Sequence, residues 1–213
     1  MLVVAGMKQN RNTKVIVITG SIGTGKSTAV NILKKMGFKV LDSDKIVHEG
    51  YNKGSRLYGK IVDFFGNEIL NEDGTVNRQK LGNIVFNDED KLNAINDLVH
   101  VYVVKELMKG VNECSDDVIF LDIPLILEGK DKEISYGLKY DEIWLVYVSE
   151  KTQRERLEKR ALMENKNPQE VLKIISKQLP IEQKKSMADE VIDNEGTVEE
   201  LEQNIMKLLK IKV

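Results

Sequence analysis

Apolar and polar positions along this chain of 213 residues form five short apolar runs, separated by longer segments with helical periodicity. The runs lie at about 14–19, 38–42, 118–122, 142–148 and 190–193. A strand that is buried on both faces reads as a continuous apolar run, and a parallel sheet alternates such strands with helices. The pattern therefore predicts an α/β fold built on a five-stranded, doubly wound parallel sheet with helices on both faces.

The stretch between the second and third runs is much longer than the single helix of a βαβ unit requires. It carries two apolar stripes at helical spacing, one at Leu57, Ile61, Phe64 and Phe65 and the other at Leu92, Ile95, Leu98, Val99 and Tyr102. We therefore expect one domain with a core at about 14–44, 118–150 and 187–213, a helical insertion at about 45–117 and a charged helical lid at about 151–186. Residues 1–13 are expected to form a loose extension.

The composition narrows the class of protein without indicating an activity. A net charge of −2 gives no general attraction to nucleic acid, and no apolar run approaches the length of a transmembrane helix. Cys114 is the only cysteine, which excludes an intrachain disulfide and a cysteine-based metal cluster and is typical of a reducing compartment. We therefore expect a cytoplasmic protein, a monomer or a weak homo-oligomer, without a nucleic-acid or membrane partner.

A glycine-rich segment links the first strand to a helical stretch that ends near Gly37. It reads Gly20-Ser21-Ile22-Gly23-Thr24-Gly25-Lys26-Ser27 and satisfies the P-loop pattern. Glycines let successive backbone N–H groups turn toward a phosphate, the lysine adds a cation near the β and γ phosphates, and the serine hydroxyl can ligate Mg²⁺. We expect nucleotide contacts from Gly20, Ile22, Gly23, Thr24, Gly25, Lys26, Ser27 and Thr28, with Ser27 as the metal ligand.

Carboxylates follow three of the predicted strands at the point where each strand ends. Asp42-Ser43-Asp44 follows the second strand, Asp122-Ile123-Pro124 and then Glu128 follow the third, and Asp193-Asn194-Glu195-Gly196 follows the last. The carboxyl ends of parallel strands meet at one edge of the sheet, where the P-loop also lies. A single aspartate at such a place is more often a helix N-cap, but the three strands together favour a site.

These residue types supply each part that phosphoryl transfer to a hydroxyl needs. Asp44 or Asp42 could accept the hydroxyl proton, and Ser27 with a water-mediated carboxylate could hold Mg²⁺. Arg156 and Arg160 lie four residues apart, so a helix would project both from one face of the lid toward the phosphates. The alternative for the two arginines is an exposed helix surface.

With these residues in place, the chain resembles the dephospho-coenzyme A kinase family from about Val15 to its end. The resemblance is carried by Thr19 to Ser27, Asp42-Ser43-Asp44 with His48, Phe65-Gly66, Asp73-Gly74 with Arg78, Asp122-Ile123-Pro124-Leu125 with Glu128, Tyr140-Asp141, Gln153 with Arg156 and Arg160, Gln178, Lys184, Ala188-Asp189, and Ile192-Asp193-Asn194 with Gly196. It implies a single P-loop kinase domain in which ATP, with Mg²⁺, phosphorylates the ribose 3′-hydroxyl of dephospho-coenzyme A.

The resemblance also implies a role for each matching residue. Asp44 would be the base, and Lys26, Arg156 and Arg160 would act on the phosphates. The helical insertion would form the coenzyme A domain, and Asn194 and Gly196 would lie by the adenine of ATP. The acceptor would be bound by Thr19, Asp42, Asp44, His48, Arg78, Pro124, Leu125 and Glu128.

One departure from the family pattern bears on the acceptor. Asp97-Leu98 stand where the family commonly has His-Pro, and a carboxylate there would repel an acceptor that carries phosphates. Two further hypotheses therefore stay open: a P-loop kinase of another small molecule, and a nucleotide-binding module without transfer activity.

Overall fold

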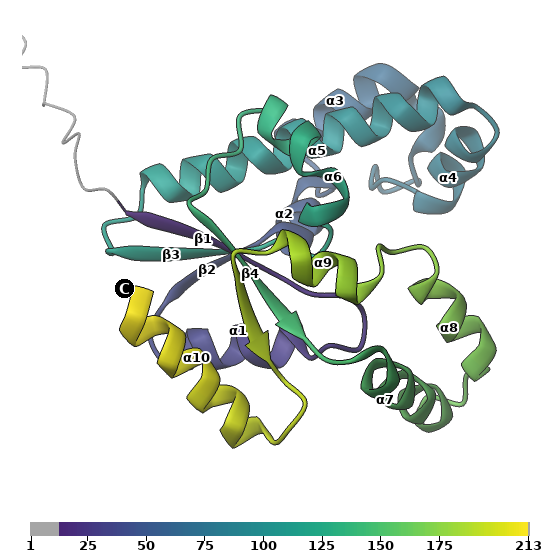
Figure 1. The fold of residues 1–213 in the computed structure, drawn as a ribbon. Helices are drawn as coiled ribbons and strands as arrows, with labels where there is room; N and C mark the ends of the chain where they lie inside the picture. The colour runs from purple at the N-terminus through teal and green to yellow at the C-terminus, as the bar shows by residue number, and fades with distance from the viewer. Residues whose placement is uncertain (1–12, 213) are drawn as a thin grey trace, which may run out of the picture.

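The computed structural model describes residues 13–212 and contains one five-stranded parallel sheet. The expected loose extension at 1–13 lies, apart from Thr13, outside the described residues. The sheet has the order β2-β3-β1-β4-β5 (Figure 1). Its strands are β1 (Lys14–Thr19), β2 (Lys39–Asp42), β3 (Val118–Asp122), β4 (Glu142–Tyr147) and β5 (Glu190–Asp193). The five predicted strands are confirmed, with β2 beginning and β4 ending one residue inside the predicted bounds.

Helices cover both faces of the sheet, as the continuous apolar strands predict. Along β1, Ile16 and Ile18 pack against α1 (Lys26–Lys35) and α10 (Val198–Lys212). The alternate residues Val15 and Val17 pack against α5 (Glu89–Asn112) and α6 (Ile126–Ser135) on the other face. Because successive side chains of a strand point to opposite faces, each strand contributes to two cores, and the α/β prediction is confirmed.

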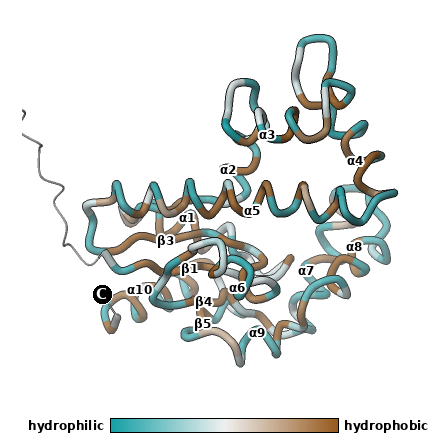
Figure 2. Tube along the Cα trace, turned by 90° about the horizontal axis from the view of Figure 1, so that it is seen from above, coloured by the Kyte–Doolittle hydropathy of each residue, from teal (hydrophilic) through white to brown (hydrophobic). Residues whose placement is uncertain are grey.

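The long stretch after β2 folds into helices with a core of their own. It comprises α2 (Ser43–Gly50), α3 (Arg56–Phe65), a 3₁₀ turn (Asn67–Ile69), α4 (Arg78–Phe86) and α5. Of the expected first stripe, Leu57, Ile61 and Phe65 are buried, but Phe64 is 55% exposed, so its assignment to the stripe was wrong. At 3.6 residues per turn, Phe64 points about 60° away from the mean direction of these three buried side chains. Figure 2 shows α5 running from this cluster across the sheet, with apolar positions along its length.

Three helices occupy the charged segment before β5. They are α7 (Glu150–Met163), α8 (Pro168–Ile175) and α9 (Ile181–Met187), and α7 and α8 pack together beyond the sheet (Figure 1). Within 13–212 no helix is long and apolar enough to cross a membrane.

Replacing Ile61 by alanine tests the separate core of the insertion. Ile61 is fully buried, so the substitution should leave a cavity and lower the free energy of unfolding by about 3 kcal/mol. Phe64→Ala on the same helix is the matched control and should cost about 1 kcal/mol or less, because its ring contacts Phe65 from the surface. Urea unfolding curves measure both, and equal losses would contradict the assigned helix face.

Candidate active site

The P-loop turns from β1 into α1 with geometry that only glycine supplies. Gly23 has φ 84° and Gly25 has φ 85°, both in the left-handed region. A Cβ on Gly20 would come within 2.6 Å of Thr24 Oγ1, and a Cβ on Gly25 would overlap the Asn194 amide. Helix α1 begins at Lys26, so its N-terminal N–H groups face the space that the loop encloses. The loop has the form of an anion-binding site.

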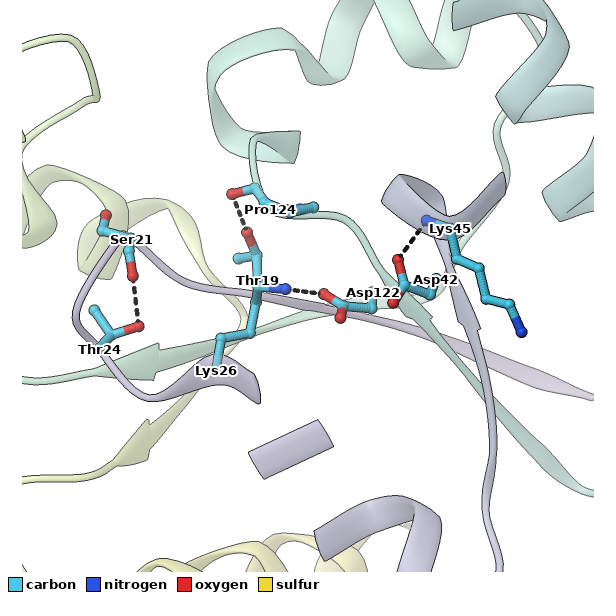
Figure 3. A network of polar contacts seen from close by, with 8 residues as sticks. All are labelled: Thr19, Ser21, Thr24, Lys26, Asp42, Lys45, Asp122 and Pro124. Carbon is cyan, nitrogen blue, oxygen red and sulfur yellow. Dashed lines mark hydrogen bonds and ion pairs between the residues drawn. The ribbon is translucent and has the colours of Figure 1, made fainter. Parts of the chain in front are cut away.

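The Lys26 ammonium contacts Asp122 Oδ1 at the end of β3 (Figure 3). Burial raises the pKa of Asp122, the Lys26 cation opposes this shift, and the nearby carboxylates Asp42 and Asp44 add to it. The structure thus brings together, at one edge of the sheet, the P-loop lysine and three of the carboxylates that follow the predicted strands.

Asp42 and Asp44 have different surroundings. Asp42 is the N-cap of α2, where its Oδ1 accepts a hydrogen bond of 3.0 Å from Lys45 N–H (Figure 3). Asp44 lies in the first turn of α2 and lines a cavity of about 530 Å³. The capping bond occupies one carboxylate oxygen of Asp42, whereas Asp44 is among the residues that line the cavity.

This cavity lies between α2, α5 and the segment that leads from β3 into α6. Its wall is mainly apolar, from residues such as Val47, Val99, Val103 and Ile123, and its volume suits a small-molecule ligand. The predicted acceptor residues Asp44, Pro124, Leu125 and Glu128 line it. Thr19 Oγ1 donates a hydrogen bond of 2.9 Å to the Pro124 carbonyl, which fixes this wall to β1. His100, Lys132, Glu133 and Gln178 also line it, and the sequence prediction did not include them.

Glu128 is held at the cavity by a buried cation. Lys184 of α9 has no exposed surface, and its Nζ lies 2.5 Å from Glu128 Oε1. A buried ammonium requires a counter-ion, so the carboxylate at the cavity wall has a fixed position. Lys184 was one of the residues that carried the family resemblance, but its spacing alone gave no signal of this contact.

Two predicted acceptor residues, His48 and Arg78, contact each other within the insertion. The distance from Arg78 Nη2 to His48 Nδ1 is 3.4 Å, and the Arg78 guanidinium lies 5.1 Å from the centre of the Tyr51 ring. Neither side chain is among the described residues that line the cavity. Their part in acceptor binding stays a prediction.

Two glutamines of the predicted lid segment, 151–186, form hydrogen bonds with the backbone of the P-loop. Gln153 Nε2 of α7 donates to the Ile22 carbonyl at 2.7 Å, and Ile22 N–H donates to Gln178 Oε1 at 3.2 Å. The backbone N–H and the carbonyl of Ile22 are therefore both hydrogen-bonded by side chains of the protein itself. Sequence spacing could not reveal these contacts, because they join residues more than 130 positions apart.

The two lid arginines are placed differently. Arg156 Nη2 donates at 2.8 Å to the carbonyl of Asn194, whose Nδ2 in turn donates at 2.7 Å to the Thr24 carbonyl of the P-loop. Arg160 has 62% of its side chain exposed, and its Nε lies 2.7 Å from Glu164 Oε1. Hydrogen bonds from Arg160 and then Lys166 hold the pKa of Glu164 at about 2. The structure brings Arg156 close to the P-loop and leaves Arg160 on the surface of α7. A phosphate role for either arginine stays a prediction.

Asn194 and Gly196 follow β5 behind the P-loop. The Asn194 amide is buried against Thr24, and a Cβ on Gly196 would overlap the Glu200 carboxylate. That carboxylate accepts from Thr197 N–H at 2.8 Å in a capping box at the start of α10. A contact of either residue with adenine stays a prediction.

The oxygen donors at this edge fit Mg²⁺. Ser27 is exposed in the first turn of α1, and Asp122 ends the strand β3. Magnesium prefers hydroxyl, carboxylate, phosphate and water oxygens. Among residues 13–212 no group of three or more His, Cys, Asp or Glu side chains could hold a metal ion, so nucleotide phosphates and water would have to complete the shell.

Gly25→Ala should abolish binding of an ATP analogue, as measured by calorimetry. The added Cβ would overlap the Asn194 amide and strain a left-handed backbone. Gly37→Ala is the control, because Gly37 has φ 92° with open space around it. It should cost about 1–2 kcal/mol of stability and leave the affinity for the analogue unchanged. Normal affinity in Gly25→Ala would contradict the assigned loop geometry.

Comparison with known proteins agrees with this geometry. A family model described as dephospho-CoA kinase matches residues 14–200. A dephospho-CoA kinase of Carboxydothermus hydrogenoformans is 40% identical over 199 residues, covering 92% of this chain and 93% of that protein. A dephospho-CoA kinase of Aquifex aeolicus is 38% identical, and the match covers 92% of this chain and 95% of that protein.

Solved structures share the fold. A Thermus thermophilus structure superposes with a TM-score of 0.75 at 27% identity, covering 95% of this chain and all (100%) of its own. A dephospho-CoA kinase from Campylobacter jejuni, with a TM-score of 0.63 at 23% identity and 92% and 95% of the two chains covered, supports the fold alone. With a family model matched over most of its length and curated relatives at 38–40% identity, the chain belongs to the dephospho-CoA kinase family.

Proposed function

We propose that this chain transfers the γ-phosphoryl group of ATP to the ribose 3′-hydroxyl of dephospho-coenzyme A, giving coenzyme A and ADP. The observation that carries the proposal is the position of Asp44. It lines an apolar cavity large enough for an acceptor, and its charge is close enough to the Lys26–Asp122 pair to raise the pKa of Asp122. A base, an acceptor cavity and a P-loop thus share one edge of the sheet.

The donor half of the site rests on the P-loop and Lys26. Backbone N–H groups of residues 23–28 and the start of α1 are arranged to receive phosphate oxygens. Lys26 would exchange the Asp122 carboxylate for the β and γ phosphates, which carry more charge. Mg²⁺, when bound by Ser27 and the phosphates, would neutralise charge on the transferred group.

The acceptor half rests on the cavity. Asp44 would accept the proton of the attacking hydroxyl, while the apolar wall excludes water that could otherwise compete as acceptor. Glu128, fixed by Lys184, offers a carboxylate to a donor group of the acceptor. We also propose a cytoplasmic location, which the single cysteine supports, and a monomer or weak homo-oligomer.

An acceptor panel tests the proposed reaction. Coupled ADP release should appear with dephospho-coenzyme A and not with shikimate or nucleoside monophosphates, because only the first fills the cavity and brings its hydroxyl to Asp44. Equal turnover of another acceptor would favour a different small-molecule kinase. ATP binding without turnover of any acceptor would favour a nucleotide-binding module.

Asp44→Asn should lower kcat by about 10²–10⁴-fold while leaving ATP affinity nearly intact, because it removes a proton acceptor and no phosphate contact. Asp42→Asn is the matched control, since asparagine caps a helix as well as aspartate does. Asp42→Asn should lower kcat far less than Asp44→Asn does. Lys26→Ala should damage both turnover and ATP affinity. A larger loss in Asp42→Asn than in Asp44→Asn would transfer the role of base to Asp42.

The lid arginines give a second kinetic test. Arg156→Ala and Arg160→Ala should each lower kcat, by about 10³-fold if the guanidinium neutralises the transferred phosphoryl group. Arg154→Ala, on an exposed position of α7, is the control and should keep normal turnover. If Arg160→Ala matched this control, Arg160 would be a surface residue paired with Glu164, as its contacts here show.

A further inference from the structure

Polar side chains at the rim of the cavity connect α5 to α6. Lys132 Nζ lies 2.8 Å from Asp97 Oδ1, and the Tyr136 hydroxyl donates to the same oxygen at 2.8 Å. One turn along α5, His100 Nδ1 contacts Glu133 Oε1. We call Asp97, His100, Lys132, Glu133 and Tyr136 the rim cluster. It contains the aspartate that departs from the family pattern.

Lys132 is the only lysine or arginine among the described residues that line the cavity. The other charged lining residues are the acids Asp44, Glu128 and Glu133. Glu128 is already paired with Lys184, and Glu133 with His100. Arg78, the other predicted acceptor cation, is turned toward His48 and Tyr51. For an acceptor that carries a diphosphate, Lys132 is therefore the cation that the cavity wall offers.

The Lys132–Asp97 pair is open to exchange. Its side chains are 48% and 53% exposed, and ion pairs at such positions contribute little stability because water screens them. A diphosphate carries more charge than one carboxylate and so competes well for the ammonium. After exchange, Asp97 would keep its hydrogen bond from the Tyr136 hydroxyl.

We propose that Lys132 binds the diphosphate of the acceptor and that Asp97 competes for the same ammonium, so the pair sets acceptor affinity and selects diphosphate-bearing acceptors. This inference rests on the proposed function, because it names the acceptor that the kinase site takes. Asp97 then weakens acceptor binding by occupying Lys132 and not only by direct repulsion.

Two substitutions should act in opposite directions on acceptor binding. Lys132→Met should raise the KM and Kd for dephospho-coenzyme A about tenfold, the effect of losing one charged hydrogen bond. Asp97→Asn should lower both about threefold, because it frees the ammonium while keeping an acceptor oxygen for Tyr136. Each variant should keep kcat and the KM for ATP within about twofold. Lys130→Met, on α6 but outside the cavity lining, is the control and should change nothing.

Adenosine separates a diphosphate contact from a change in cavity shape. It carries the 3′-hydroxyl without phosphates, so its inhibition constant against dephospho-coenzyme A should be the same in wild type and Lys132→Met. If the rim cluster only holds α5 against α6, both substitutions would weaken the binding of dephospho-coenzyme A and of adenosine together. That result would overturn the inference. Unchanged constants in Lys132→Met would overturn it too.

The same measurements distinguish failure of this inference from failure of the proposed function. If the wild type binds dephospho-coenzyme A without phosphorylating it, the proposed function is wrong, and the calorimetric Kd values of the variants still decide the role of Lys132. If the wild type phosphorylates it and the variants do not diverge, only the inference is wrong. If the wild type does not bind it, both are wrong.

Discussion

The ion pair between Lys26 and Asp122 connects the P-loop to the strand that leads into the cavity wall. It connects the first turn of α1, which presents the P-loop, to the end of β3, which leads directly into the cavity wall. Because β3 lies between β2 and β1 in the sheet, the same carboxylate is next to Asp42 and Asp44 on one side and the P-loop on the other. A parallel sheet makes this convergence unavoidable, since its strands all end at one edge.

The P-loop is also fixed from outside the sheet. Asn194 holds the Thr24 carbonyl, and Gln153 and Gln178 hold both peptide groups of Ile22. A loop fixed in this way does not have to be ordered when phosphates bind, so less conformational entropy opposes nucleotide binding. Gln178 also lines the cavity proposed for the acceptor, so one side chain of the segment 151–186 is next to both the P-loop and that cavity.

Local sequence predicted the features that depend on local physics. Continuous apolar runs identified all five strands, and the glycine pattern identified the loop, because each needs only adjacent residues. Residue spacing did not decide whether Asp42 or Asp44 is the base. It also placed Phe64 on the buried face of its helix, because an apolar stripe does not fix the rotation of a helix about its axis to within one residue. The contacts Lys132–Asp97 and Gln178–Ile22 depend on how the insertion and the lid lie against the core, which periodicity does not specify.

The central claim is that one sheet edge holds the donor phosphates and a ribose 3′-hydroxyl in a single site with Asp44 as base. Phosphorus NMR of the product formed from ATP and dephospho-coenzyme A tests it most directly, because it reports which oxygen receives the phosphoryl group. The account predicts a new phosphate monoester coupled to the ribose 3′ proton, formed in step with ADP. A monoester on another hydroxyl, or inorganic phosphate in place of a phosphorylated acceptor, would contradict it.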